Sequence, residues 1–119
     1  MAQTVIEKIV QAHAVNLAAG QTVRAGDYVT LVPDHVMTHD NTSAVLGKFN
    51  GLGVGKVKNP RQPVFTLDHN IQDTGEETLA KYRKTAEFAA EQGIDAYPAG
   101  RGIGHQIMVE EGYVKPGGF

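Results

Sequence analysis

The sequence predicts an α/β domain in which a parallel sheet is flanked by helices, in a three-layer αβα arrangement. Three short runs rich in apolar and β-branched residues, at 27–32, 65–67 and 94–97, have the composition of strands. Helical patterns separate these runs, and connections of ordinary length favour crossovers between parallel strands. With 119 residues and no internal repeat, residues 1–119 are expected to form a single domain.

The first predicted element is a helix that runs from Thr4 to Gly20. Thr4 and Glu7 have the spacing of a capping box, and apolar residues then recur at helical intervals. A turn leads into the strand at 27–32, where Pro33 removes a backbone donor and ends the strand.

A dense polar segment follows at 34–43, and its end offers several N-caps for a helix that stops near Gly51. His35 and His39 are four residues apart, a spacing that suits a metal on a helix. The preceding proline and the capping residues favour a loop instead. A well-capped junction and a ligand-binding loop are both compatible with this composition. A further short strand is expected at 56–58.

Two ionisable residues, Asp68 and His69, directly follow the predicted central strand Phe65-Thr66-Leu67. In an open α/β sheet, ligands bind at the carboxyl ends of the strands. A carboxylate beside an imidazole can fix the tautomer of the ring and keep it protonated as a general acid. The alternative is an exposed loop pair without chemistry.

A third helix is expected to open at Asp73 or Thr74 and to end at Gly93, because each opening residue is followed by a glutamate three positions later. Its predicted buried stripe consists of Leu79, Tyr82, Ala86 and Ala89, with Phe88 beside it. A short strand at 94–97 should follow.

The last glycine-rich segment, 100–106, lies between the strand at 94–97 and an apolar helical pattern through Ile107 and Val109. The dinucleotide-binding fingerprint would need glycine where His105 stands. The segment therefore predicts a close-approach loop that presents an imidazole near a helix N-terminus, which can attract a carboxylate. A histidine that only caps or packs is the alternative.

The composition excludes several classes of protein. Eleven basic and 13 acidic residues give a net charge of −2, so a nucleic-acid partner is not expected. No apolar run approaches membrane-spanning length and the start lacks signal-peptide features, so a soluble intracellular protein is expected, in the cytoplasm or the mitochondrial matrix. The absence of cysteine excludes disulfides and thiolate metal ligands from this chain. The turn-rich end suggests an incomplete portion of a longer protein.

Three blocks in this order and spacing, 37–43, 65–69 and 97–113, resemble the amino-terminal part of the aconitase family. The resemblance covers essentially the whole chain. It implies a [4Fe-4S] hydro-lyase in which one cluster iron acts as a Lewis acid on the substrate. Within the family, the blocks are most similar to the enzymes of lysine biosynthesis that convert homocitrate to homoisocitrate through cis-homoaconitate. The large subunit of isopropylmalate dehydratase is next, and aconitase itself is a further alternative.

The resemblance also assigns roles to individual residues. Asp68 and His69 match the catalytic pair that protonates the departing hydroxyl, and His105 matches an active-site histidine that holds the substrate. His39 and Asp40 match a substrate-binding position at which aconitase has glutamine next to aspartate. The histidine at this position favours homocitrate or isopropylmalate over citrate as the substrate.

Other parts of the family pattern are missing from this chain, namely an Asp-Ser-His motif, the cluster cysteines and the swivelling domain with the catalytic base. We therefore expect a portion of a longer enzyme that faces a tri- or dicarboxylate substrate, holds no cluster and is inactive without the remaining domains. Two alternatives stay open. One is a stand-alone, non-catalytic module for anion binding or assembly. The other is a mononuclear metal site built from His35, His39, His69 and His105.

Overall fold

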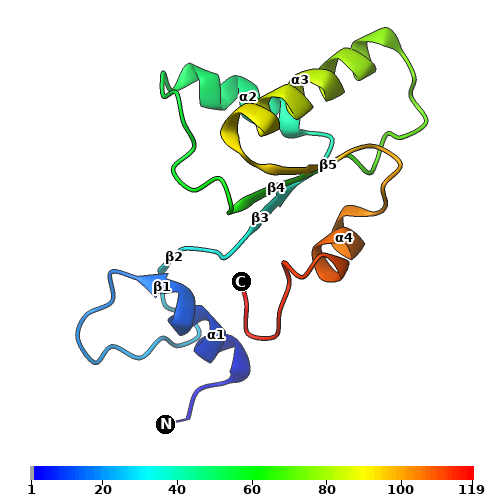
Figure 1. The fold of residues 1–119 in the computed structure, drawn as a ribbon. Helices are drawn as coiled ribbons and strands as arrows, with labels where there is room; N and C mark the ends of the chain where they lie inside the picture. Colours follow the sequence, from blue (N-terminus) through cyan, green and yellow to red (C-terminus); the bar gives the residue numbers. More distant parts are fainter. Residues whose placement is uncertain (1) are drawn as a thin grey trace. The chain divides into compact units, whose positions relative to one another are not determined.

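The structure, a computed structural model, describes residues 2–119, and contacts group them into two compact units (Figure 1). The larger unit comprises His35–Tyr113. The smaller unit combines the residues up to Asp34 with the segment Val114–Phe119. The residues predicted to form the site, His39, Asp40, Asp68, His69 and His105, all belong to the larger unit.

The larger unit is built on a parallel sheet of β3 (Val36–Thr38), β4 (Pro63–Thr66) and β5 (Asp95–Tyr97), in that spatial order. Helix α2 (Thr42–Gly51) connects β3 to β4, and α3 (Glu76–Gln92) connects β4 to β5. Figure 1 shows α2 and α3 on one side of the strands and α4 (Gly104–Glu110) on the other. The predicted α/β class with a parallel sheet and flanking helices is confirmed.

The central strand β4 is buried on both faces, which explains its nearly continuous apolar sequence. Phe65 belongs to a core cluster with Leu46 of α2, Ala89 of α3 and Ile94. The alternate residue Thr66 is fully buried on the opposite face, against the start of α4. Burial on two sides fixes the register of β4 and hence the position of Asp68, two residues beyond its end.

The first strand of the parallel sheet differs from the prediction. The segment 27–32 contains only β2 (Thr30–Leu31), which pairs antiparallel with β1 (Ala14–Val15) in the smaller unit. The parallel sheet instead begins with β3, inside the segment predicted as a polar loop. Three strand-compatible residues there are flanked by polar ones, so their strand character comes from pairing with β4 and not from a local pattern.

The first helix is shorter than predicted. The capping box is confirmed, because Thr4 Oγ1 accepts a bond from Glu7 N and Glu7 Oε2 accepts one from Thr4 N. However, α1 (Val5–His13) ends well before Gly20, since the next two residues form β1. Pairing with β2 therefore overrides the helical periodicity that continues in the sequence. The strand predicted at 56–58 is not formed.

Helix α3 begins two to three residues later than predicted. Asp73 does not cap it by the expected N-cap bond. Its carboxylate accepts bonds from Gly75 N at 2.8 Å and from Thr78 Oγ1 at 2.6 Å, so the preceding turn is fixed instead. The predicted end is confirmed, since Gly93 has φ of 73° in the left-handed region.

The buried face of α3 is also rotated from the predicted stripe. Thr85 and Ala89 are buried, whereas Ala86 and Leu79 are exposed. The packing of α3 against both α2 and the sheet selects this face, and helical spacing alone could not distinguish it from the neighbouring one.

The smaller unit is held by a histidine at the end of α1. His13 Nδ1 lies 2.9 Å from Ile9 O, and His13 Nε2 lies 2.9 Å from Asp34 Oδ2. The Ile9 carbonyl and then the Asp34 carboxylate raise the pKa of His13, because both ring nitrogens face acceptors. In the part of the chain from residue 2 onward, no helix is both long and apolar enough to cross a membrane.

Candidate active site at the carboxyl ends of the strands

Asp68 and His69 follow β4 and contact each other directly. His69 Nδ1 lies 2.5 Å from Asp68 Oδ1, so the predicted acid–imidazole pair forms. The other oxygen of Asp68 accepts a 2.6 Å bond from the backbone N–H of Gly104, the first residue of α4. The Asp68 side chain is only 3% exposed, whereas that of His69 is 62% exposed. A buried carboxylate thus holds an imidazole that remains accessible.

The contacts of Asp68 keep it ionised. Burial alone would raise its pKa, but the Gly104 amide and the His69 ring together outweigh burial and lower it. A carboxylate can only accept, so the proton between Asp68 and His69 belongs to Nδ1 of the ring. The tautomer inferred from this bond leaves His69 Nε2 as the nitrogen that can exchange a proton with a ligand.

Asp40 follows β3 and binds the backbone on which His69 sits. Its Oδ2 accepts bonds from the backbone N–H groups of His69, at 2.6 Å, and Asn70, at 3.0 Å. Its Oδ1 lies 3.3 Å from the hydroxyl of Tyr82 on α3, and the same hydroxyl lies 3.0 Å from Asn70 O. Burial, followed by the charge of Asp40, raises the pKa of Tyr82, so this hydroxyl keeps its proton.

His39 completes a group of four predicted residues at this edge of the sheet. The centroids of the His39 and His69 rings are 4.6 Å apart, with the rings tilted by 41°. His39 Nδ1 is buried and has no hydrogen-bond partner among residues 2–119. The structure therefore brings together His39, Asp40, Asp68 and His69, which come from the ends of two neighbouring parallel strands.

His105 lies near this group of residues because its neighbour Gly104 contacts Asp68. It is the second residue of α4 and follows Gly104, whose amide binds Asp68. Its side chain is exposed and makes no hydrogen bond within the described part of the chain. The structure thus places the start of α4 against Asp68, which in turn contacts His69. The shared ligand pocket of His69 and His105 stays a prediction.

Two sets of residues in this chain contain side chains of the types that bind metals. Ligand atoms of His39, Asp40 and His69 lie within 4.8 Å of one another, but both Asp40 oxygens already accept hydrogen bonds. The four-histidine site is not formed among residues 2–119, because the group of ligand side chains that lie together there contains His39 and His69 but neither His35 nor His105. The chain has no cysteine and so offers no thiolate to an iron–sulfur cluster.

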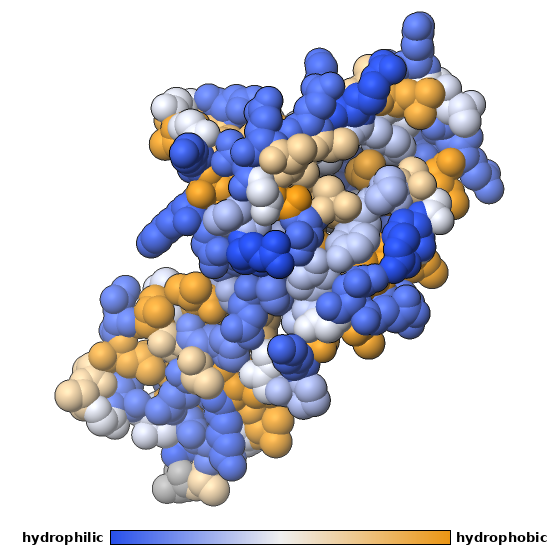
Figure 2. Space-filling model, in the orientation of Figure 1, coloured by the Kyte–Doolittle hydropathy of each residue, from blue (hydrophilic) through white to orange (hydrophobic). Residues whose placement is uncertain are grey.

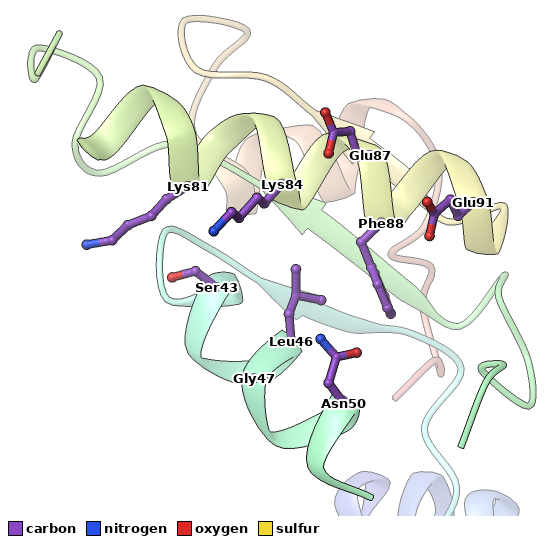
Figure 3. A pocket seen from close by; sticks show the side chains of 9 residues that line it. All are labelled: Ser43, Leu46, Gly47, Asn50, Lys81, Lys84, Glu87, Phe88 and Glu91. Carbon is purple, nitrogen blue, oxygen red and sulfur yellow. The ribbon is translucent and has the colours of Figure 1, made fainter. Parts of the chain in front are cut away.

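A cavity of about 460 Å³ lies between α2 and α3 (Figure 3). Lys81 and Lys84 line it together with Glu87 and Glu91, so its wall carries both signs of charge. None of the five predicted site residues lines this cavity. We therefore assign the candidate site to the edge of the sheet and not to this cavity.

Sequence reasoning missed two contributors to the site. Tyr82 was predicted only as part of the buried stripe of the third helix. A buried hydroxyl needs a hydrogen-bond partner, so its place in that stripe could have indicated a polar contact. Gly104 was seen only as part of a close-approach loop. The hydrogen bond from its backbone N–H to Asp68 joins residues 36 positions apart, so no local sequence pattern could predict it.

The fold and the site belong to a known class of protein. A family model described as "Aconitase family (aconitate hydratase)" matches residues 7–119. Because this match covers nearly the whole sequence, the chain belongs to the aconitase family, and the predicted resemblance is confirmed.

Similar curated proteins include several named "Homoaconitase, mitochondrial". The chain is 61% identical over 115 residues to that of Cryptococcus neoformans var. neoformans serotype D, covering 97% of this chain and 16% of the relative. The homoaconitase of Neurospora crassa is 58% identical, over 97% of this chain and 15% of the relative. That of Kluyveromyces lactis is 58% identical, over 96% and 16%. The chain spans about one-sixth of the length of these relatives.

Proposed function

We propose that this chain is the substrate-facing portion of a hydro-lyase that interconverts homocitrate and homoisocitrate through cis-homoaconitate, in lysine biosynthesis. Membership of the aconitase family and identities of 56–61% to homoaconitases support this choice over isopropylmalate dehydratase and aconitase. The observation that carries the chemical part is the 2.5 Å contact between Asp68 and His69, next to the bond from Gly104 to Asp68.

In this proposal His69 is the general acid of dehydration. The bond between carbon and the hydroxyl oxygen breaks, the hydroxyl takes the proton from His69 Nε2, and water leaves. Asp68 holds the ring by Nδ1, which leaves Nε2 to face the hydroxyl. The proton on the neighbouring carbon goes to a base outside this chain. In the hydration direction, His69 takes the proton back from water.

His105 and His39 are proposed to bind the carboxylates of a tri- or dicarboxylate substrate. Imidazole N–H groups can donate hydrogen bonds to carboxylate oxygens. Asp40 was assigned to substrate binding by resemblance, and its bonds to the backbone of residues 69 and 70 support an indirect contribution.

The [4Fe-4S] cluster of the complete enzyme is proposed to be held by the domains outside this chain, because the chain contains no cysteine. When bound, the cluster supplies Lewis-acid activation of the substrate hydroxyl. The remaining domains are also the proposed partners of this chain. The same proposal includes a single α/β domain over residues 1–119, as an incomplete portion of the catalytic subunit. It also includes a location in the mitochondrial matrix, with the cytoplasm as the alternative. The matrix is favoured because the relatives carry "mitochondrial" in their names.

Complementation tests this function. The chain is combined with the remaining part of the enzyme, reconstituted with iron and sulfide, and assayed with homocitrate, isopropylmalate and citrate. We expect activity with homocitrate only when both parts are present, and a loss of at least about 100-fold in His69→Ala, the scale of general acid catalysis.

The result also distinguishes the stand-alone module from the enzyme portion. Binding of homocitrate to the isolated chain, lost in His69→Ala and His105→Ala, with no activity after complementation, would favour an anion-binding module and contradict the hydro-lyase. Activity that prefers isopropylmalate or citrate would retain the reaction class and change the substrate.

A further inference from the structure

The exposed imidazole of His69 has few direct contacts that hold it in place. Its ring is tethered by Nδ1 to Asp68, and its side chain is 62% exposed. The backbone beneath it, by contrast, is held firmly. Two consecutive amides, those of His69 and Asn70, donate to the same oxygen of Asp40. The orientation of the ring therefore depends on a carboxylate from the neighbouring strand.

That carboxylate is held by a hydroxyl from another element. The Asp40 side chain is 16% exposed, and its second oxygen lies 3.3 Å from the Tyr82 hydroxyl, across 42 residues of sequence. The same hydroxyl lies 3.0 Å from Asn70 O. Tyr82 therefore contacts both Asp40 and the backbone of residue 70, which Asp40 also binds. The turn continues to Asp73, which accepts a bond from Asn70 Nδ2 at 3.2 Å.

We infer that Asp40 and Tyr82 are positioning residues that fix the backbone of residues 69–70, so that His69 Nδ1 stays on Asp68 and Nε2 faces the ligand. Helix α3 thereby contributes to the site, although no α3 residue was predicted to. The link to catalysis rests on the proposed hydro-lyase function, whereas the link to the geometry of His69 does not.

Charge and geometry support this role over direct contact of Asp40 with substrate carboxylates. Asp40 is an anion, and an anion repels a carboxylate ligand. Its Oδ2 already accepts two amides and lies 3.6 Å from His69 Nδ1, which favours the ring orientation that meets Asp68. The single proton of the Tyr82 hydroxyl is shared between two acceptors that both belong to this arrangement.

The tautomer of His69 is the direct test. The 119-residue chain labelled with ¹⁵N-histidine is studied by NMR at about pH 8.5, where an ordinary imidazole is neutral. In the unmodified chain we expect the Nδ1–H tautomer of His69 to predominate. In Tyr82→Phe, which keeps the ring and removes the hydroxyl, the ratio of Nδ1–H to Nε2–H should fall roughly fivefold, the effect of one lost hydrogen bond.

Two further variants make the test decisive. Asp40→Asn should reduce the same ratio at least as much as Tyr82→Phe, and it replaces Tyr82→Phe if that variant does not fold. Tyr28→Phe is the matched control, because Tyr28 is fully exposed in the smaller unit, and it should leave the ratio unchanged. An unchanged ratio in folded Tyr82→Phe and Asp40→Asn would overturn the positioning role.

The full-length enzyme that contains this chain gives the catalytic readout. Tyr82→Phe should lower kcat roughly five- to tenfold with KM changed less than about twofold, because the hydroxyl acts through His69 and not on the substrate. An unchanged kcat beside a changed tautomer ratio would overturn the catalytic part. A full-length enzyme without hydro-lyase activity would contradict the proposed function, while the NMR result would still decide the positioning role.

Discussion

Gly104 lies so close to Asp68 and Thr66 that there is no room for a side chain at this position. A Cβ at this position would be 2.5 Å from Thr66 Oγ1, 2.8 Å from Asp68 Oδ2 and 3.1 Å from Met37 Sδ. The backbone of residue 104 is not left-handed, so the requirement for glycine is steric and not conformational. The close approach is what allows the Gly104 amide to reach Asp68.

We expect Gly104→Ala to lower the free energy of unfolding by about 1–3 kcal/mol, the usual cost of inserting an atom into a packed site. Urea denaturation of the chain measures this. The added methyl group should also displace the start of α4 and weaken the hydrogen bond from the backbone N–H of residue 104 to Asp68.

Gly47→Ala is the matched control, since a Cβ at this position in α2 meets no atom within 4 Å. It should be neutral or slightly stabilising, because alanine is the better helix former. Equal destabilisation by both substitutions would show that the close approach at Gly104 does not matter.

The stability of the chain should depend on pH through Asp68. Its pKa is lowered on folding, so its contribution to stability is present above the ordinary value of 3.8 and is lost as the pH falls through the folded-state pKa. We expect Asp68→Asn to be less stable than the original chain near pH 6. Denaturation curves recorded from pH 6 downward should show this difference shrinking below about pH 4. A pH-independent difference would contradict an ionised Asp68.

At the scale of elements, α3 connects the core to the site. Its buried residue Ala89 packs with Phe65 and Leu46, while Tyr82, about two turns earlier, reaches Asp40. Because core packing fixes α3, it also fixes the position of the Tyr82 hydroxyl relative to Asp40. The C-terminal stop at Gly93 sets where α3 ends and β5 begins.

We expect Gly93→Ala to destabilise the chain by about 1 kcal/mol, because alanine disfavours the left-handed conformation that Gly93 adopts. Gly93→Asn should cost less, since asparagine tolerates that conformation better. Thermal or urea unfolding of the two variants provides the measurement. Nothing lies within 4 Å of a Cβ at this position, so an equal loss in both would point away from backbone conformation as the cause.

Elements were predicted best where local chemistry decides them. The capping box at Thr4 and the helix stop at Gly93 depend on neighbouring residues, and both are confirmed. The strand β3 and the end of α1 depend on pairing with segments far away in the sequence, so periodicity misassigned them. The rotation of the buried face of α3 has the same origin.

At the scale of the whole molecule, many large apolar side chains remain exposed. Leu52 is 73% exposed, Val5 and Ile6 are each 69% exposed, and Ile103 is 66% exposed. Figure 2 shows apolar areas interspersed with polar ones on the visible face. Since the homoaconitases are about six times longer than this chain, exposed apolar surface of this kind fits the proposal that further domains contact it.

We expect the purified chain to bind no stoichiometric iron after reconstitution with iron and sulfide, because it offers no thiolate ligand. Colorimetric iron and sulfide analysis, together with visible absorption, measures this. The full-length enzyme treated in parallel is the control and should take up a cluster. About four irons per isolated chain would contradict the assignment of the cluster to the other domains.

The sequence by itself determined the α/β class, the family and the adjacency of Asp68 and His69, because composition, motifs and neighbouring residues are local properties of the chain. Only the tertiary structure decided that β3 starts the parallel sheet, that Tyr82 holds Asp40 and that Gly104 binds Asp68. These contacts join residues between 27 and 42 positions apart. They exist because burial of β4 on both faces fixes where its neighbours lie, and that information resides in packing and not in any short stretch of residues.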